Sequence, residues 1–585
     1  MRQTLHMRVD RDTSVRMRDG TTLYADVYRP ASDGPYPVLL QRTPYDKELN
    51  ALALLQMDPL RAVSRGYAVV IQDVRGRYRS EGEFHPFYQE IDDGFDTVEW
   101  CAAQPWSSGD VGMYGASYVG AVQWLAAVAR PPHLKCIVPM ITASDYYEGW
   151  TYQGGAFQWG FMVGWVLPFL TAADLVRRKE DVANFPARLE QLADAVDKLH
   201  ETASTLPLKD LPFVGEYSSY FLDWLSHSTR DDFWRAISIQ ERFDQVSVPA
   251  FNLGGWYDIF QGGTLTNFAG VRASGATREA RQGTRLLIGP WTHSTPTNNQ
   301  VGTVDFGIRS SQHLSVLKFD VDGEFLRFYD YWLKGIDSSL GSEPPIRLFV
   351  MGENVWRHEH EWPLARTRFT SYYLHSGGAA NSIKGDGGLS QEEPEIERPD
   401  VYLYDPHRPV PTCGGQLCCY TSQLPPGAFD QREVEARDDV LVFKTAPLDQ
   451  DVEVTGPVSL HLWACTSAAD TDFTGKLVDF CPDGCARNLT DGIIRTRFHL
   501  GTDQPRPITP GAVVQYRIDL GSTSNLFRRG HRIGLEISSS NFPRFDRNLN
   551  TGRVLGEDAE VRTAVQTIYH DQDHPSRLVV PVIPR

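Results

Sequence analysis

A serine stands between two glycines in the segment GASYVG, residues 115–120, which follows a predicted strand and opens a predicted helix. A turn of this kind raises a serine hydroxyl above the edge of a parallel sheet. Small neighbours are needed because the turn brings backbone close to backbone. The spacing is G-x-S-x-x-G rather than the strict G-x-S-x-G, and a serine that only caps the helix is the alternative. We predict that Ser117 is a nucleophile.

An acid and a base follow this serine along the chain. Asp258 comes just after the strand-like run 248–253, and His293 comes just after the run 285–288. Serine is a poor nucleophile unless a neighbouring base takes its proton. The order serine, acid, histidine is that of the α/β-hydrolases. Since both candidates lie past the C-terminal end of a predicted strand, we expect them to meet Ser117 at one edge of a sheet.

A hydrolase that forms a tetrahedral intermediate also needs hydrogen-bond donors for its oxyanion. The backbone N–H of Tyr118, the residue after the nucleophile, is one such donor. The loop after the predicted strand 37–40 reads QRTPYDK and lies where these sheets supply the second donor. The hydroxyl of Tyr45 in this loop is our candidate, and the alternative is a tyrosine that only packs behind Pro44.

No metal or organic cofactor is expected, because serine and histidine complete this chemistry without one. His358 and His360 flank a glutamate, but no third ligand is evident beside them, and we expect a solvated surface. Cys481-Pro-Asp-Gly-Cys485 has the Pro-Asp-Gly of a turn and no second Cys/His pair to complete a zinc set.

The elements that must position these residues follow from the hydrophobic pattern. Continuous apolar runs separated by helical stretches predict buried parallel strands in the first third of the chain, at 37–40, 67–71, 111–114 and 136–139. From about 143 to 240 helical spacing takes over, which predicts a cap above the C-terminal strand ends. After about 350, residues such as Val458, Leu460 and Leu462 alternate with period two, which predicts an antiparallel sandwich.

Composition limits the class of protein. The chain has 585 residues, 41 % of them hydrophobic and 22 % charged, which excludes a largely disordered or fibrous protein. The net charge of 57 − 74 = −17 disfavours nucleic acid or an anionic membrane as the main partner. The apolar run 155–175 is broken by Gln158, Pro168 and glycines, so we expect core helices and no membrane span. The N-terminal stretch is charged throughout, and we expect a cytoplasmic protein.

The chain has eight cysteines, and ordinary reduced or buried thiols are the favoured interpretation. The adjacent pair Cys418-Cys419 could instead form a vicinal disulfide. The sequence leaves that alternative open.

Several motifs together carry a resemblance. The segments RTPYDK, QDVRGRYRSEGEF, GASYVG, GGWYDIF and GPWTHS resemble the bacterial cocaine esterase family, which is grouped with the X-Pro dipeptidyl-peptidases and the α-amino-acid ester hydrolases. The resemblance continues through LFVMG, VTGP, DTDF and SSSNFP, so it covers nearly the whole chain. It implies an α/β-hydrolase domain in 1–144 and 241–350, a helical cap in 145–240 and a jelly-roll domain in 351–585.

The resemblance also implies roles for single residues. It gives Ser117 as nucleophile, His293 as base and Asp258 as the acid that orients the base. It gives the Tyr45 hydroxyl and the Tyr118 N–H as the oxyanion hole.

The same resemblance suggests that Trp150, Trp165 and Phe260 line an acyl pocket. The chain departs from the family at Cys418 and Cys419, where larger apolar side chains are expected close to the substrate. Thiols in their place predict a reshaped pocket.

The resulting hypothesis is a serine esterase acting on small esters with an aromatic or bulky apolar acyl group. An amidase, an acylase or an X-Pro-type aminopeptidase is the alternative, and a site that grips a free amine would need carboxylates such as Asp145 or Glu148. A jelly-roll binding protein on an inactive hydrolase scaffold is a third possibility. An exposed sheet edge makes a homodimer a further expectation.

Overall fold

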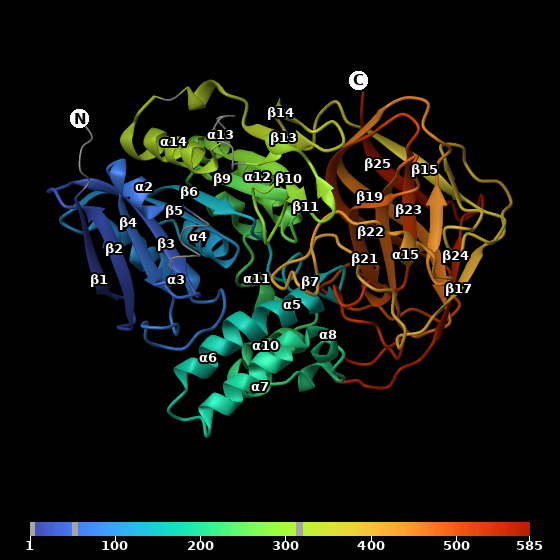
Figure 1. The fold of residues 1–585 in the computed structure, drawn as a ribbon, viewed down its shortest axis with the longest axis horizontal. Helices are drawn as coiled ribbons and strands as arrows, with labels where there is room; N and C mark the ends of the chain where they lie inside the picture. The colour runs from blue at the N-terminus through green and yellow to red at the C-terminus, as the bar shows by residue number, and fades with distance from the viewer. Residues whose placement is uncertain (1–5, 50–56, 312–319, 338, 585) are drawn as a thin grey trace.

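A computed structural model describes residues 6–49, 57–311, 320–337 and 339–584. Figure 1 shows a sheet with helices on both sides at the left, a group of helices below it and a β-sandwich at the right. These are the α/β-hydrolase core, the helical insert and the C-terminal sandwich, so the predicted fold class is confirmed.

The hydrolase core is built on one ten-stranded sheet. Seven neighbouring strands of this sheet, from β4 to β13, run parallel, and antiparallel strands extend it at both ends. Its strands in spatial order are β1 (Met7–Arg16), β2 (Thr22–Pro30), β4 (Ala68–Asp73), β3 (Tyr36–Thr43), β5 (Ser107–Ala116), β6 (Leu134–Met140), β9 (Phe251–Tyr257), β10 (Arg285–Thr292), β13 (Ile346–Val350) and β14 (Val355–Glu359).

Helices cover both faces of this sheet, which explains why its central strands are continuously apolar. Helices α3 (Glu90–Ala102) and α4 (Tyr118–Val128) pack on one face, and α2 (Pro59–Ser64) and α14 (Val321–Lys334) pack on the other. Helix α14 begins at an Asp320 side chain that accepts from the Gly323 N–H, and it ends at Gly335 in the left-handed conformation.

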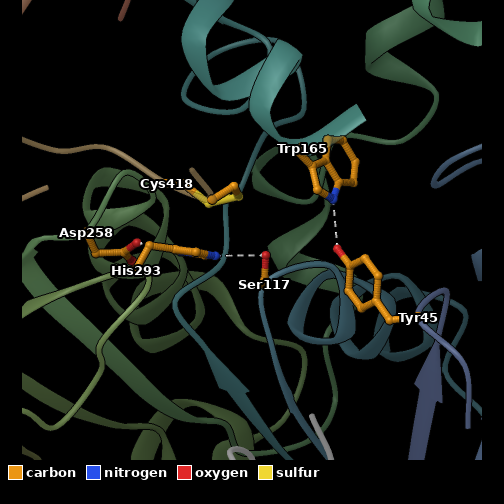
Figure 2. Close-up of a disulfide and its surroundings, with 7 residues drawn as sticks. Tyr45, Ser117, Trp165, Asp258, His293 and Cys418 are labelled. Atoms are coloured by element: carbon orange, nitrogen blue, oxygen red, sulfur yellow. Dashed lines mark hydrogen bonds and ion pairs between the residues drawn. A yellow bond between two sulfur atoms is a disulfide. The ribbon is translucent and has the colours of Figure 1, made fainter. Parts of the chain in front are cut away.

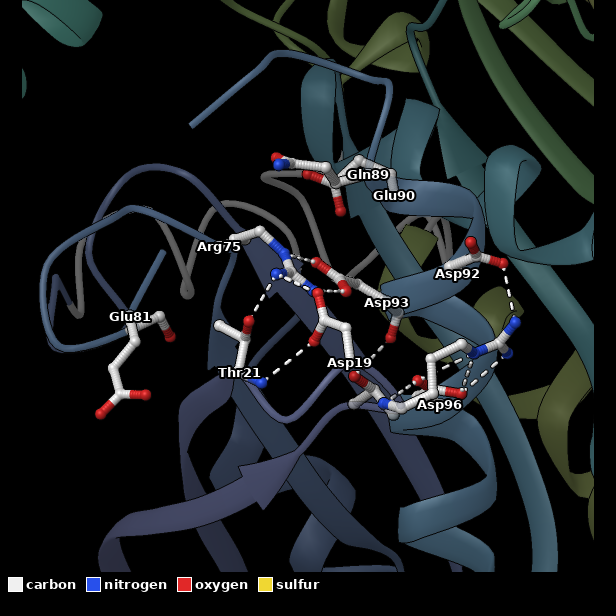
Figure 3. A network of polar contacts seen from close by, with 12 residues as sticks. Asp19, Thr21, Arg75, Glu81, Gln89, Glu90, Asp92, Asp93 and Asp96 are labelled. Atoms are coloured by element: carbon white, nitrogen blue, oxygen red, sulfur yellow. Dashed lines mark hydrogen bonds and ion pairs between the residues drawn. The ribbon is translucent and has the colours of Figure 1, made fainter. Parts of the chain in front are cut away.

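A polar network fixes the start of α3 (Figure 3). The Arg75 guanidinium donates to both carboxylate oxygens of Asp93 at 2.9 and 2.6 Å, and to Asp19 and Thr21 at 2.7 Å each. The nearby guanidinium lowers the pKa of Asp19 to about 2. The loop after β4 and the β1–β2 turn are therefore tied to the first turn of α3.

The helical insert lies over the C-terminal strand ends. Helix α5 (Trp159–Trp165), a π-helical turn η1 (Val166–Thr171) and α6 (Ala172–Arg177) run on without a break. This segment is long and apolar enough to cross a membrane by length and composition, yet 72 % of its most apolar window is buried inside the protein, as in a core helix. The remaining helices of the insert are α7 (Phe185–Asp197), α8 (Leu199–Thr202), α9 (Val214–Tyr217), α10 (Tyr220–Ser226) and α11 (Asp232–Arg235).

The C-terminal part is a β-sandwich whose apolar core is continuous with buried residues of the hydrolase sheet, such as Trp256 and Leu348. The expected alternation is clearest in β19, where Val458, Leu460 and Leu462 are buried and the residues between them are partly exposed. Its strands are β15 (Arg368–His375), β16 (Gly388–Ser390), β17 (Asp400–Tyr404), β18 (Leu441–Lys444), β19 (Val452–Thr466), β20 (Asp472–Phe480), β21 (Ala486–Arg495), β22 (Val514–Phe527), β23 (Arg532–Ser538), β24 (Ala564–Tyr569) and β25 (Arg577–Ile583).

The hydrolase sheet extends past the expected boundary at residue 350. Strand β14 pairs antiparallel with β13 through the register Val350↔Val355, so the sheet continues to Glu359. A hairpin of this kind cannot be divided between domains, because each strand supplies the backbone partners of the other.

Candidate active site

Ser117 lies on a tight turn between β5 and α4. Its backbone has φ +61° and ψ −126°, a conformation that residues with a side chain seldom adopt. Gly115 before it has φ +138°. A Cβ at Gly120 would lie 2.9 Å from the Thr142 Cβ and 3.0 Å from the Met140 carbonyl oxygen. These two positions explain the glycines of the GASYVG segment.

The structure brings the serine, the histidine and the aspartate together (Figure 2). His293, just after β10, places Nε2 3.0 Å from the Ser117 Oγ and Nδ1 2.8 Å from the Asp258 Oδ1. Asp258 is fully buried just after β9. Since a carboxylate only accepts, a neutral imidazole here carries its proton on Nδ1 and leaves Nε2 to accept from the serine hydroxyl. This arrangement can take a proton from Ser117.

The C-terminal domain holds the strand end that carries Asp258. The Gln261 side-chain amide donates to the Trp256 carbonyl at 3.1 Å and to the Ser522 carbonyl at 2.5 Å, and its oxygen accepts from the Ser522 N–H at 3.0 Å. The Tyr257 hydroxyl donates to the Asn488 carbonyl at 2.8 Å. The position of the acid therefore depends on β21 and β22 as well as on β9.

Two groups can stabilise an oxyanion beside Ser117. Tyr118 is the first residue of α4, where a backbone N–H has no partner within the helix. Its buried side chain is anchored, because the hydroxyl donates to Glu90 and accepts from the Phe87 N–H, both at 3.0 Å. Tyr45 supplies the second group, since its side chain lines the same cavity as Ser117.

The Trp165 indole determines what the Tyr45 hydroxyl can do. The indole N–H donates to the Tyr45 oxygen at 2.9 Å (Figure 2). An indole N–H can only donate, so the tyrosine oxygen accepts and its own proton is left for another acceptor. Burial raises the pKa of the Tyr45 hydroxyl well above its usual value, which keeps that proton in place.

Replacing Tyr45 by phenylalanine is expected to lower kcat by about 10² to 10³ with little change in KM. The substitution removes one oxyanion donor and leaves the ring in place. Steady-state kinetics on p-nitrophenyl benzoate measures the effect. A KM increase with unchanged kcat would instead place Tyr45 in ground-state binding.

Trp165→Phe is the matched control, since it keeps a ring but loses the N–H. If the indole acts through Tyr45, the variant loses activity in the wild-type background and almost none in the Tyr45→Phe background. Equal losses in both backgrounds would show that Trp165 acts independently of Tyr45.

Asp73 holds the loop that carries Tyr45. It is fully buried at the end of β4, and its Oδ1 accepts from the Lys47 N–H at 2.8 Å. Burial raises the pKa of the Asp73 carboxyl from its ordinary 3.8 to about 7, against the opposing effect of backbone N–H donors. The loop thus rests on a carboxyl group that titrates near neutral pH.

Asp73→Asn is expected to change the pH dependence of stability. Between about pH 4 and about pH 7 folded Asp73 keeps a proton that the unfolded chain has lost, so its contribution to stability falls as the pH rises through this window. The variant keeps an oxygen for Lys47 but cannot titrate. The Tm of the variant minus the Tm of wild type should therefore increase as the pH rises from about 4 to about 7, and it should stay constant above about pH 7. Calorimetry from pH 4 to 8 measures both curves, and parallel curves would contradict the assignment.

An apolar cavity of about 260 Å³ opens beside Ser117. Trp165 and Cys419, two of the five predicted pocket residues, line it. The side chains that line it come from the hydrolase core, the insert and the C-terminal part: Tyr45, Ala116, Ser117, Ile141, Trp165, Phe169, His293, Ser294, Pro296 and Cys419.

The other three predicted pocket residues lie behind this lining. Trp150 and Phe260 stack on each other with ring centroids 4.3 Å apart, and both are almost fully buried. The Phe260 ring also contacts His293, at 5.1 Å between centroids. Cys418 is only 2 % exposed. They differ from the prediction because all three are buried in the apolar core and do not line the cavity.

Phe169 is a pocket residue that the sequence interpretation missed. It lines the cavity and contacts the Tyr45 ring edge-on at 6.1 Å. It follows Trp165 by four residues in the apolar run 155–175, and side chains four apart share one face of a helix. That spacing was the available signal.

The sulfur atoms of Cys418 and Cys419 are bonded to each other. The favoured interpretation of ordinary thiols is therefore wrong for this pair, and the vicinal alternative holds. The other six cysteines are free.

One group of possible metal ligands lies in the sandwich. The ligand atoms of Asp479, Cys481 and His531 all lie within 4.8 Å of one another. Asp479 accepts from His531 at 2.8 Å and raises the pKa of that imidazole, while burial raises the pKa of the Cys481 thiol to about 12. Both shifts favour protonated forms, which do not bind a metal ion.

Comparisons with known proteins show which family the chain belongs to. Residues 19–295 match the family model of the X-Pro dipeptidyl-peptidase (S15 family), and residues 339–579 match the model of the X-Pro dipeptidyl-peptidase C-terminal non-catalytic domain. The chain is 41 % identical to the cocaine esterase of Rhodococcus sp. (strain MB1 Bresler), over 98 % of both chains.

Solved structures show the same architecture. An α-amino acid ester hydrolase superposes with a TM-score of 0.78 at 25 % identity, covering 98 % of this chain and 96 % of that one. An aminopeptidase from a Thaumarchaeota archaeon also gives 0.78, at 24 % identity, over 99 % and 97 % of the two chains, and this likeness concerns the fold alone.

Proposed function

The chain belongs to the X-Pro dipeptidyl-peptidase (S15) family and is a cocaine-esterase-like serine esterase, and from this premise we propose that it cleaves small, uncharged esters with an aromatic or bulky apolar acyl group. The observation that supports this proposal is the lining of the cavity beside Ser117. None of the described residues that line it is an aspartate, glutamate, lysine or arginine, and Trp165, Phe169 and Ile141 present apolar surface.

The proposed reaction is a double displacement through an acyl-enzyme. His293 takes the Ser117 proton as the serine oxygen attacks the ester carbonyl. The Tyr45 hydroxyl and the Tyr118 N–H donate to the resulting oxyanion. The imidazolium, stabilised by Asp258, gives its proton to the leaving alcohol. Water then repeats the sequence with the same base and frees the carboxylic acid.

Matched substrates test the acyl preference. We expect a higher kcat/KM for p-nitrophenyl benzoate than for phenylalanine p-nitrophenyl ester, and a far lower value for phenylalanine p-nitroanilide. A preference for either aminoacyl substrate would reverse the proposal in favour of an aminopeptidase or amino-ester hydrolase.

The aminopeptidase alternative requires a carboxylate for the substrate amine. The predicted candidates do not line the cavity. Asp145 is buried and accepts from Arg230 and from the Ser238 hydroxyl, both at 2.7 Å. Glu148 accepts from the Gly154 N–H at 3.1 Å. Both carboxyl groups are therefore engaged in the structure of the insert, which favours the ester hypothesis.

We also propose a homodimer, in the cytoplasm. The end strand β17 exposes Val401 and Leu403 by 47 % and 56 %, and Val565 on the neighbouring β24 is 44 % exposed. A second copy of the chain is the occupant that we propose for this apolar face.

Light scattering is expected to give twice the chain mass of 65.8 kDa for wild type and a single chain mass for Leu403→Asp. The charge would be desolvated in the interface, while the position is exposed in one copy. A wild-type mass of one chain at micromolar concentration would rule the dimer out.

A further inference from the structure

The bonded pair Cys418 and Cys419 forms part of the wall around the nucleophile. Cys419 lines the same cavity as Ser117 and His293. Figure 2 shows the disulfide above the line from His293 to Ser117, with Tyr45 on the other side of Ser117. Any acyl or alcohol group bound at Ser117 must share this space with the sulfur atoms.

The two cysteines differ in their freedom to move. Cys418 is 2 % exposed and belongs to the apolar core, together with Leu417 and Leu424. Cys419 is partly exposed toward the cavity and has φ +76°, a conformation that a residue with a side chain adopts at a cost. If the bond were opened, Cys419 is the residue with both free space and a reason to move.

Both ends of the surrounding loop are held, so the loop as a whole cannot follow such a change. At one end the Gln416 amide donates to the Trp256 carbonyl at 3.3 Å. At the other end Gln423 donates to the Asp197 carbonyl and accepts from the His200 N–H at 3.3 Å. These contacts attach the loop to the hydrolase core and to the insert. A change at 418–419 must therefore be taken up locally, at the cavity wall.

We propose that Cys418–Cys419 is a reversible redox-modification site that determines which acyl groups the active site accepts. The proposal rests on the proposed function only in that the acyl group occupies the cavity beside Ser117. The reductant is a small dithiol. Its thiolate attacks the accessible Cys419 sulfur, the S–S bond breaks and the Cys418 thiolate leaves and takes a proton.

The second thiol of the reductant then attacks the mixed disulfide and completes the exchange. Two electrons and two protons pass to the protein, which gains two thiols, while the reductant becomes a cyclic disulfide. A low-molecular-weight disulfide such as oxidised glutathione reverses the reaction.

Reduction is expected to narrow the cavity. Two thiols cannot remain as close as two bonded sulfur atoms, and since Cys418 is enclosed, the Cys419 side chain moves into the free space. Ser117, His293 and Asp258 are unaffected, so esters with a small acyl group remain substrates. Esters with a bulky acyl group lose space at the reacting carbon.

The test compares p-nitrophenyl benzoate with p-nitrophenyl acetate before and after treatment with dithiothreitol. We expect the benzoate-to-acetate ratio of kcat/KM to fall by at least roughly threefold on reduction, since one methylene of pocket space changes selectivity by about tenfold or more. Oxidised glutathione should restore the ratio. An unchanged ratio after complete reduction would overturn the proposal.

Mass spectrometry after alkylation with iodoacetamide reports on the bond itself. In the untreated protein neither Cys418 nor Cys419 should be alkylated, and both should be alkylated when the protein is reduced in the folded state and then denatured in the presence of iodoacetamide. Alkylation of both in the untreated, folded protein would overturn the proposal. This readout is independent of the substrate, so it separates a failure here from a failure of the proposed acyl preference.

Variants identify the cysteines responsible. Cys418→Ser/Cys419→Ser should show a ratio that does not respond to dithiothreitol, whatever its value. Cys413→Ser, which removes a free cysteine of the same domain, should respond as wild type does. A response that persists in the double variant would assign the effect to other cysteines and overturn the proposal.

Discussion

Replacing Ser117 by alanine is expected to lower kcat by about 10⁶ and to abolish labelling by a fluorophosphonate probe. The expected loss is this large because the serine oxygen forms the acyl-enzyme, and His293 Nε2 lies 3.0 Å from that oxygen, ready to take its proton. Stopped assays with p-nitrophenyl benzoate, run at high enzyme concentration, measure the residual rate.

Ser294→Ala is the matched control, since this second serine also lines the cavity. It should retain fluorophosphonate labelling. A Ser117→Ala protein that keeps near-wild-type turnover, or a Ser294→Ala protein that loses labelling, would mean that the nucleophile is assigned wrongly.

Asp258→Asn is expected to lower kcat by about 10⁴ with an unchanged fold. The carboxylate accepts from His293 Nδ1 at 2.8 Å and so keeps the proton off Nε2. An amide in its place can donate its own N–H to Nδ1, which selects the tautomer that cannot take the serine proton. The measurement is kcat/KM as a function of pH, together with Tm to verify folding.

Asp305→Asn on the short β12 strand (Val304–Asp305) provides a control, because that carboxylate is exposed and close in sequence to His293. Its kcat should stay within a factor of two of wild type. A loss below tenfold in Asp258→Asn would show that another group orients the imidazole.

The positions of Ser117, Asp258 and His293 could be predicted from local patterns because parallel strands end at one edge of a sheet. Each residue follows an apolar run, and the topology alone brings the three strand ends together. The change to helical spacing at about residue 143 and to period-two alternation after about 350 predicts the cap and the sandwich, and the motifs of the resemblance extend over nearly the whole chain. Both arguments use only local sequence patterns, and neither requires knowledge of which side chains meet in the folded protein.

The lining of the pocket could not be predicted in the same way. Whether Trp150 faces the cavity depends on how it stacks with Phe260, and that depends on where the insert lies over the sheet. The four-residue spacing puts Phe169 on the same face as Trp165, but which face meets the cavity depends on how the insert packs over the sheet. These are tertiary contacts, and residue types at neighbouring positions do not encode them.

The state of Cys418 and Cys419 is a further case. Adjacent cysteines in a sequence leave both the thiols and the bonded form open, because the outcome depends on the backbone at Cys419, with its φ of +76°. The extension of the hydrolase sheet to Glu359 likewise depends on a hairpin that the change in periodicity near residue 350 conceals.

Three stretches of chain contribute walls of the cavity without supplying a proton-transfer residue or an oxyanion donor, namely the insert at Phe169, the strand end at Ile141 and the loop at Cys419. Substitutions in these stretches can therefore change which esters the enzyme accepts without changing its catalytic residues. Substitutions within one of these stretches can change the acyl group that is accepted and leave Ser117, His293 and Asp258 in place. For protein engineering, each of these three stretches can be randomised separately to change the acyl specificity of the enzyme.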